Sequence, residues 1–169
     1  MGEGSGSEAT PAKNETTVER TSERELVVRR TVNGPARLVW KAWTTPELFR
    51  RWWVPRSYGL TLLTCDMDVR VGEQYQLVFR HEESTMAFFG TYVEVTPYTR
   101  LVWTNEEGTG GTTVTTVTFE EQAGKTVIVV HDLYPSADAI DTGSTGAMPE
   151  TLDQLEELLV TLGTGRENA

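Results

Sequence analysis

The chain has few of the features that mark secreted or membrane proteins. It contains one cysteine, Cys65, so an intrachain disulfide is impossible and a reducing compartment is expected. No stretch reaches the ~18 consecutive apolar residues that a transmembrane helix requires. The N-terminus also lacks the apolar core of a signal peptide. These absences predict a cytoplasmic protein without a membrane segment.

Positive charge is scarce as well. Lys and Arg number 15 against 25 Asp and Glu, which gives a formal net charge of −10. Nucleic acids and anionic membranes are bound through basic side chains, so neither partner is expected. The charged side chains of residues 35–56 are mainly basic, and those of residues 149–169 are mainly acidic. This pattern predicts two solvated helix faces or, alternatively, an acidic helix near a basic one or a charged edge that meets a partner.

Motifs for catalysis, metal binding and phosphate binding are also missing. Cys65 lies in a strand-like run without a neighbouring base, which predicts a buried, inert thiol. Asp66 and Asp68 share one strand face, but two carboxylates alone are a weak metal signal, and Asp68 is expected to pair with Arg70. The glycines within 108–111 belong to a hairpin loop that no helix follows. No serine stands where it could act with a histidine, so no catalytic residue, cofactor or metal is predicted.

A dense aromatic cluster stands out against these absences. Four of the five tryptophans lie between residues 40 and 53. They are Trp40, Trp43, Trp52 and Trp53. Tryptophan is large and amphipathic, so such a cluster needs a deep apolar surface to pack against. The apolar residues from Ala36 to Trp43 follow helical spacing, which predicts one short helix that buries Trp40 and Trp43.

A second short helix is expected directly after the first. Pro35 suits the first position of the first helix, and Thr45 followed by Pro46 repeats a helix-start signal. This second helix brings Phe49 close to the last two tryptophans before Pro55 ends it. The two helices interrupt a chain that otherwise reads as β-strands, separated by short turns that favour antiparallel neighbours. The strands are expected at 25–32, 60–71, 73–80, 86–95, 100–105, 112–121 and 125–133.

The chain ends in a long amphipathic helix. Its apolar stripe runs from Met148 to Leu162, with Pro149 in the first turn and Gly163 as the stop signal. An antiparallel sheet that buries one face needs a cover, and this helix is the only expected element long enough to provide it. The prediction is therefore an α+β, helix-grip fold: a curved seven-stranded antiparallel sheet around the C-terminal helix. One domain is expected over residues 24–163, between a disordered tail at 1–23 and a flexible tail at 164–169.

The sequence resembles a known family in three blocks. The first runs from Ala36 through Ala-Trp-Thr-x-Pro-Glu to Trp52-Trp53, the second is Asp68-Val-Arg-Val-Gly72, and the third is Phe89-Gly-x-Tyr-x-Glu-Val95 with Pro97 and Arg100-Leu-Val102. These blocks are similar to bacterial relatives of the C-terminal domain of the Hsp90-ATPase activator, in the START/Bet v 1-like SRPBCC superfamily. The resemblance covers residues 24–162 and implies the helix-grip fold. The relatives include lipid binders, polyketide cyclases and stress-linked proteins, so the resemblance implies no single function.

Two departures from the family pattern bear on the expected cavity. The lead-in to the last helix, residues 139–149, looks about one turn shorter than in relatives, and Pro149 replaces an ordinary helix former. The usual Gly-Gly after Arg70 is Gly72-Glu73 here, which is expected to alter only a turn.

The family pattern also implies that Asp132 faces the concave side while His131 faces outward. His81 is expected in a surface turn.

Inward-facing residues of the strands and the last helix are the candidate ligand site. An apolar pocket with a few polar groups is the usual form of a small-molecule site. The alternative is that these side chains fill a solid core. The candidates are Trp52, Trp53, Tyr75, Leu77, Phe79, Phe88, Tyr92, Trp103, Thr115, Val117, Asp132, Met148, Leu152 and Leu155.

Three functions are compatible with this pattern. The first is non-catalytic binding of a small hydrophobic molecule, such as a lipid, flavonoid or polyketide. The second, implied by the resemblance alone, is a module that regulates an Hsp90-type chaperone; the partner could also be a second copy of the chain. The third is a cyclase or aromatase-like enzyme in which Tyr75, Tyr92, Thr115 or Asp132 orients a polyketide.

Overall fold

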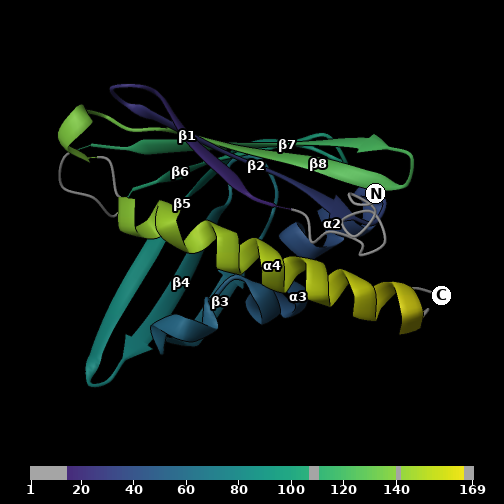
Figure 1. Cartoon of the computed structure of the whole chain (residues 1–169). Helices are drawn as coiled ribbons and strands as arrows, with labels where there is room; N and C mark the ends of the chain where they lie inside the picture. The colour runs from purple at the N-terminus through teal and green to yellow at the C-terminus, as the bar shows by residue number, and fades with distance from the viewer. Residues whose placement is uncertain (1–14, 107–110, 140–141, 166–169) are drawn as a thin grey trace, which may run out of the picture.

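A strongly curved antiparallel sheet forms one layer of the molecule, and helix α4 lies across its concave face (Figure 1). The structure is a computed structural model that describes residues 15–106, 111–139 and 142–165. The sheet has eight strands in the order β1-β2-β8-β7-β6-β5-β4-β3. They are β1 (Thr17–Ser22), β2 (Glu25–Asn33), β3 (Thr61–Met67), β4 (Gln74–His81), β5 (Ser84–Thr96), β6 (Arg100–Asn105), β7 (Thr113–Gln122) and β8 (Lys125–Leu133).

The expected strand count of seven is wrong by one. β1 lies inside the segment expected to be a disordered tail, where it pairs antiparallel with β2 from Thr17 opposite Arg29 onward. All of its side chains are exposed. Strand formation here depends on backbone hydrogen bonds to the edge of β2, which no hydrophobic pattern reveals. The tail boundaries at residues 23 and 164 stay predictions, and residues 1–14, 107–110, 140–141 and 166–169 lie outside the described residues.

The sheet owes part of its curvature to β5. The first part of this strand pairs with β4 and the last part with β6, with a register shift between Tyr92 and Glu94. Gly90 lies just before the shift. A Cβ atom added there would stand 1.7 Å from the Thr104 carbonyl oxygen, so only glycine permits this close approach of the two strands.

Two short helices connect β2 to β3, as predicted. They are α2 (Ala36–Thr44) and α3 (Pro46–Trp52), followed by a single 3-10 turn, η1 (Arg56–Tyr58). Pro35 is the N-cap of α2 and not its first residue. The Ala36 amide donates a hydrogen bond to the Glu121 side chain, so β7 supplies the negative charge that the start of α2 lacks. Thr45 is the N-cap of α3, with Pro46 at the first position, although the Thr45 side chain makes no capping bond.

Helix α4 (Thr142–Gly165) is longer than expected. A short 3-10 turn, η2 (Ala137–Ala139), precedes it. The helix begins before Pro149, which therefore lies in its interior, and continues past Gly163. Pro149 lacks an amide hydrogen and removes one backbone hydrogen bond. The sequence misplaced both ends because the contacts of α4 with β2, α2 and α3 outweigh the local signals of Pro149 and Gly163.

A buried ion cluster fixes α4 to the sheet. The Arg30 side chain of β2 is almost fully buried and donates to Asp153 at 2.8 Å and to Glu156 at 2.6 Å. Its guanidinium also donates to Thr16 Oγ1 at 2.9 Å. Removal of one partner from such a cluster would leave a buried charge uncompensated. The cluster therefore holds the helix in one position over the sheet.

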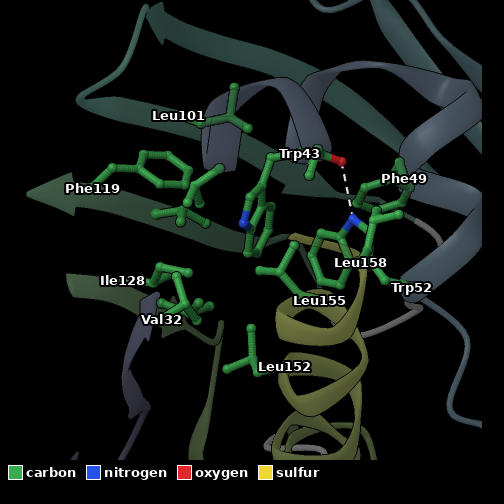
Figure 2. Close-up of a cluster of buried hydrophobic side chains, with 14 of the residues drawn as sticks. Val32, Trp43, Phe49, Trp52, Leu101, Phe119, Ile128, Leu152, Leu155 and Leu158 are labelled. Atoms are coloured by element: carbon green, nitrogen blue, oxygen red, sulfur yellow. Dashed lines mark hydrogen bonds between the residues drawn. The ribbon is translucent and has the colours of Figure 1, made fainter. Parts of the chain in front are cut away.

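The hydrophobic core lies where α2, α3 and the C-terminal half of α4 meet the sheet. Figure 2 shows Leu152, Leu155 and Leu158 of α4 facing Trp43 and Trp52. The Trp52 indole donates to the Ala42 carbonyl oxygen at 3.0 Å, drawn as the dashed line. None of the described helices is long and apolar enough to cross a bilayer.

Candidate ligand-binding site

A cavity of about 590 Å³ lies between the concave face of the sheet and the N-terminal part of α4. Strands β3 to β8 and helix α3 contribute side chains to its wall, and Ala147, Met148 and Thr151 of α4 lie opposite them. The volume is in the range of small-molecule sites. Most of the wall is apolar and aromatic.

Most of the predicted site residues line this cavity. They are Trp53, Tyr75, Leu77, Phe79, Phe88, Tyr92, Trp103, Thr115, Asp132 and Met148. The remaining four, Trp52, Val117, Leu152 and Leu155, are fully buried in the packed core and do not reach the cavity. Alternation along the strands and helical spacing along α4 placed most of these residues on inward faces, and the family pattern placed Asp132 there. They could not distinguish the packed part of the interior from the hollow part.

Aromatic rings of α2 and α3 separate the core from the cavity. The rings of Phe49 and Trp53 stack with centroids 4.7 Å apart, and Trp43 contacts Trp53 edge-on at 5.9 Å. Trp43 lines the cavity although it is 1% exposed, and it also contacts Trp103 of β6. In Figure 2 its indole nitrogen lies on the side toward Phe119, and it has no hydrogen-bond partner among the described residues. Trp43 is therefore both a core residue and part of the cavity wall, whereas the sequence predicted only the first.

A continuous chain of polar side chains crosses one wall of the cavity. The Tyr75 hydroxyl lies 2.8 Å from the Thr104 carbonyl oxygen and 3.0 Å from Asn105 Oδ1. Asn105 Nδ2 donates to Thr115 Oγ1 at 2.9 Å, and Thr115 donates to Asp132 Oδ1 at 2.6 Å. The chain thus runs from β4 to β8 and ends at a carboxyl group. It gives an otherwise apolar cavity one polar side.

The pKa of Asp132 is raised above its ordinary value. Burial disfavours the ionised carboxylate and is the largest cause, while the hydrogen bond from Thr115 and the nearby His131 oppose it. The side chain of Asp132 points into the cavity. His131 lies on the opposite face of β8, 3.6 Å from the Glu25 carboxylate. The predicted orientation of both residues is thereby confirmed.

Tyr92 is the second lining residue with a strongly altered ionisation. Burial is the largest cause that raises the pKa of its phenol, and the nearby Cys65 and Asp68 add to it. The Tyr92 hydroxyl is therefore neutral at physiological pH. Its ring lies 5.7 Å from that of Tyr75, so both phenols belong to one aromatic surface.

Gln154 of α4 fixes the segment that borders the cavity after α3. This side chain is 3% exposed. Its amide nitrogen Nε2 donates to the carbonyl oxygens of Trp52 at 2.9 Å and Val54 at 2.8 Å. Its amide oxygen Oε1 accepts a hydrogen bond from the Arg56 amide at 3.0 Å. These three bonds hold the backbone that carries Trp53 at the edge of the cavity.

Acidic residues of α4 extend this attachment to η1. Glu150 accepts hydrogen bonds from the Ser57 amide at 2.9 Å and the Ser57 hydroxyl at 2.5 Å, and these bonds lower the pKa of the Glu150 carboxyl. Glu157 pairs with Arg56 at 2.9 Å, where both side chains are exposed. The acidic helix therefore lies against part of the basic segment, one of the arrangements that the charge pattern allowed.

Other residues singled out in the sequence lie outside the cavity. Cys65 is half-buried, and burial raises the pKa of its thiol, which favours the unreactive protonated form. Asp68 pairs with Arg70 through two hydrogen bonds, as predicted. His81 is exposed at the end of β4. No group of three or more His, Cys, Asp or Glu side chains that could hold a metal occurs within the described part of the chain.

The sequence profile of the family described as "Activator of Hsp90 ATPase homolog 1-like protein" matches residues 33–160. The chain belongs to this family. No curated protein matches the chain.

Solved structures from bacteria share the family fold, which is of the SRPBCC/Bet v 1-like type. A protein from Rhodobacter sphaeroides is 24% identical, with a TM-score of 0.79, and the match covers 88% of this chain and 100% of that one. A protein from Nitrosomonas europaea is 25% identical, with a TM-score of 0.76 over 85% and 98% of the two chains. An AHSA1-like protein from Aeromonas hydrophila is 18% identical, with a TM-score of 0.69 over 82% and 94%.

Sequence reasoning missed several lining residues of this family member. Asn105 links the polar chain, and its position two residues after Trp103 on β6 would have placed it on the inward face. Tyr58 and Pro55 belong to the segment after α3, while Tyr134 and Pro135 follow β8. These loop residues carry no periodicity, so no signal in the sequence could have found them.

Proposed function

We propose that this protein binds a small hydrophobic molecule, of lipid, flavonoid or polyketide type, in the cavity between the sheet and α4. The observation that carries the proposal is a space of about 590 Å³ whose wall is mainly aromatic and aliphatic. A protein interior is normally packed to the density of an organic crystal, so an apolar space this large is unusual without an occupant.

Tryptophan fluorescence offers a direct test, because Trp53 and Trp103 line the cavity. Titration with a panel of lipids, flavonoids and polyketides should shift and quench the emission in a saturable way, and native mass spectrometry should detect a one-to-one complex. The variant Trp103→Phe keeps an aromatic ring and should reduce the fluorescence change for the same ligand. Failure of every ligand to bind with a Kd below about 100 µM would count against the proposal.

A chaperone-related function has one specific support, the family description itself. In this function the protein would bind a chaperone of Hsp90 type and alter its ATPase rate. The test is to add the purified protein to such a chaperone from a bacterium and to measure ATP hydrolysis. A change in rate that depends on protein concentration and persists when the cavity is blocked would favour this function over ligand binding. An unchanged rate at saturating protein would remove it.

A cyclase-like activity is favoured by the polar chain along the wall. Tyr75 and Asp132 are both titratable and are joined through Asn105 and Thr115. Such a chain could orient a polyketide and stabilise an enol as it forms. Incubation with linear poly-β-ketone thioesters, followed by mass spectrometry, would reveal cyclised products. A rate equal to that without protein would exclude this function and would leave ligand binding untouched.

A further inference from the structure

Asp132 is the only charged residue among the described residues that line the cavity. The wall contains no Lys, Arg or His from the described parts of the chain. An anionic ligand such as a fatty acid would therefore bring a carboxylate into an apolar space without a partner, next to a carboxyl group of the protein. The charge distribution of the wall selects against anions.

The carboxyl group of Asp132 is hydrogen-bonded on one side only. Oδ1 accepts from Thr115, and this is the one hydrogen bond of the Asp132 side chain among the described residues. The Thr115 hydroxyl receives a hydrogen bond from Asn105, so its single hydrogen must go to Asp132. The polar chain therefore ends at the Asp132 carboxyl group, which accepts hydrogen bonds. A carboxylate buried with so few partners destabilises the fold, and apart from the Thr115 bond only the nearby His131 on the opposite face of β8 favours its charge.

Aromatic residues line the same wall of the cavity as Asp132, two strands away across the sheet. The strand register puts Asp132 opposite Thr115, Thr115 opposite Trp103, and Trp103 opposite Tyr92. All four line the cavity. Two strand spacings separate Asp132 from Trp103, about 10 Å between their backbones, a gap that one small organic group can bridge. Indole and phenol rings attract cations through their faces.

We propose that the ligand of this cavity is a lipophilic amine, with its protonated nitrogen paired to the Asp132 carboxylate and its apolar body among the aromatic side chains. This inference rests on the proposed binding function and names the chemical class of the ligand. The ammonium group supplies the hydrogen-bond donors and the positive charge that Asp132 lacks. A desolvated pair of this kind, with aromatic faces nearby, contributes more than an exposed ion pair does.

The test compares three probes that share one body and differ in charge. They are 2-(1-naphthyl)ethylamine, 2-(1-naphthyl)ethanol and 1-naphthylacetic acid, titrated into the full chain by calorimetry at neutral pH and physiological salt. The same three head groups on a decyl chain test an aliphatic body. The amine should bind at least tenfold more tightly than the alcohol, and the acid at least tenfold more weakly than the alcohol. This order requires no variant, so it stands even if a variant fails to fold.

Two matched variants separate a local pair from general attraction to an acidic protein. Asp132→Asn keeps the size of the side chain and its bond from Thr115 but removes the charge, and it should abolish the preference for the amine. Glu120→Gln removes one charge from an exposed position on β7 outside the cavity wall and should leave the preference intact. Equal losses in both variants would overturn the inference.

The remaining outcomes distinguish this inference from the proposed function. If the alcohol binds as tightly as the amine, the amine inference is wrong while ligand binding in the cavity stands. If none of the six probes binds while a lipid, flavonoid or polyketide of the panel does, the amine inference fails and the proposed function stands. If neither the probes nor the panel binds, both fail.

Discussion

At one end of the space beneath the sheet, α2, α3 and the C-terminal half of α4 fill the interior completely; at the other end, the N-terminal part of α4 faces a cavity of about 590 Å³. The same strands and the same helix run through both ends. On β7 the inward side chains at the packed end are Val117 and Phe119, and those at the hollow end are Thr113 and Thr115. From Phe119 toward Thr113 the inward side chains become smaller and more polar, and the cavity begins at Thr115.

Helix α4 shows the same change along its length. Its packed part presents leucines such as Leu152 and Leu155, while its part over the cavity presents Ala147 and Thr151. A hydrophobic core can close only where large side chains of both layers meet. At the hollow end, Ala147 and Thr151 of the helix and Thr113 and Thr115 of β7 leave space between the layers. The difference teaches that the cavity begins where the inward side chains of β7 and α4 become smaller and where α2 and α3 no longer fill the interior.

The largest expected effect comes from truncation at the packed end. Leu155→Ala should lower the free energy of unfolding by about 3 kcal/mol, because Leu155 is fully buried and its removal opens a new cavity in a tight core. Met148→Ala, two helical turns earlier on the same helix, should cost under about 1 kcal/mol because Met148 already borders an empty space. Urea unfolding of both variants measures the difference. Equal losses would mean that the two ends are packed alike.

Enlarging a buried alanine should have opposite signs at the two ends. Ala42→Leu should lower the free energy of unfolding by about 1–3 kcal/mol, since Ala42 is fully buried beside Trp52 and the core has no room. Ala147→Leu should instead raise it by about 0.5–1 kcal/mol, because the added methyl groups enter the cavity. The same substitution should weaken ligand binding. Thermal unfolding together with a ligand titration checks both, and destabilisation by Ala147→Leu would contradict the comparison.

The fold was largely predictable because its elements have strong periodic patterns. Helical spacing from Ala36 to Trp43 and the alternation in the later strands set which residues face inward, and the family resemblance set the architecture. β1 escaped prediction because a polar strand at a sheet edge is held by backbone hydrogen bonds alone. The ends of α4 were misplaced because tertiary packing overrides the helix-breaking tendency of Pro149.

The sequence predicted which side chains face the interior but not how far the cavity extends. Inward alternation identified Tyr75 and Trp103 together with Val117, yet only the first two reach the empty space. Whether an inward side chain borders a cavity depends on the size of the residues opposite it, which belong to another element far away in the sequence. The inward orientation of Asp132 was implied by the family pattern, because both faces of its strand are apolar. Asn105 could have been placed on the inward face by its spacing from Trp103, but its hydrogen bond to Thr115 depends on how the strands pair.

The smallest effect, and the most specific to the hollow end, concerns the charge of Asp132. Because burial raises the pKa of this carboxyl group in the folded chain, the folded state holds the proton more tightly than the unfolded state does. Stability is therefore lost as the pH rises from the unfolded pKa, about 3.9, through the folded pKa, and the loss is complete above the latter. Asp132→Asn does not titrate.

The variant should consequently be more stable than the parent at pH 7, by on the order of 1 kcal/mol, and the difference should shrink to zero as the pH falls below about 4. Paired unfolding curves across this range measure it, and all other carboxylates cancel because both proteins share them. A difference that grows in acid would show that the folded state favours the ionised carboxylate instead. A saturating amine ligand should reverse the order at pH 7, because only the parent offers the ammonium group a carboxylate.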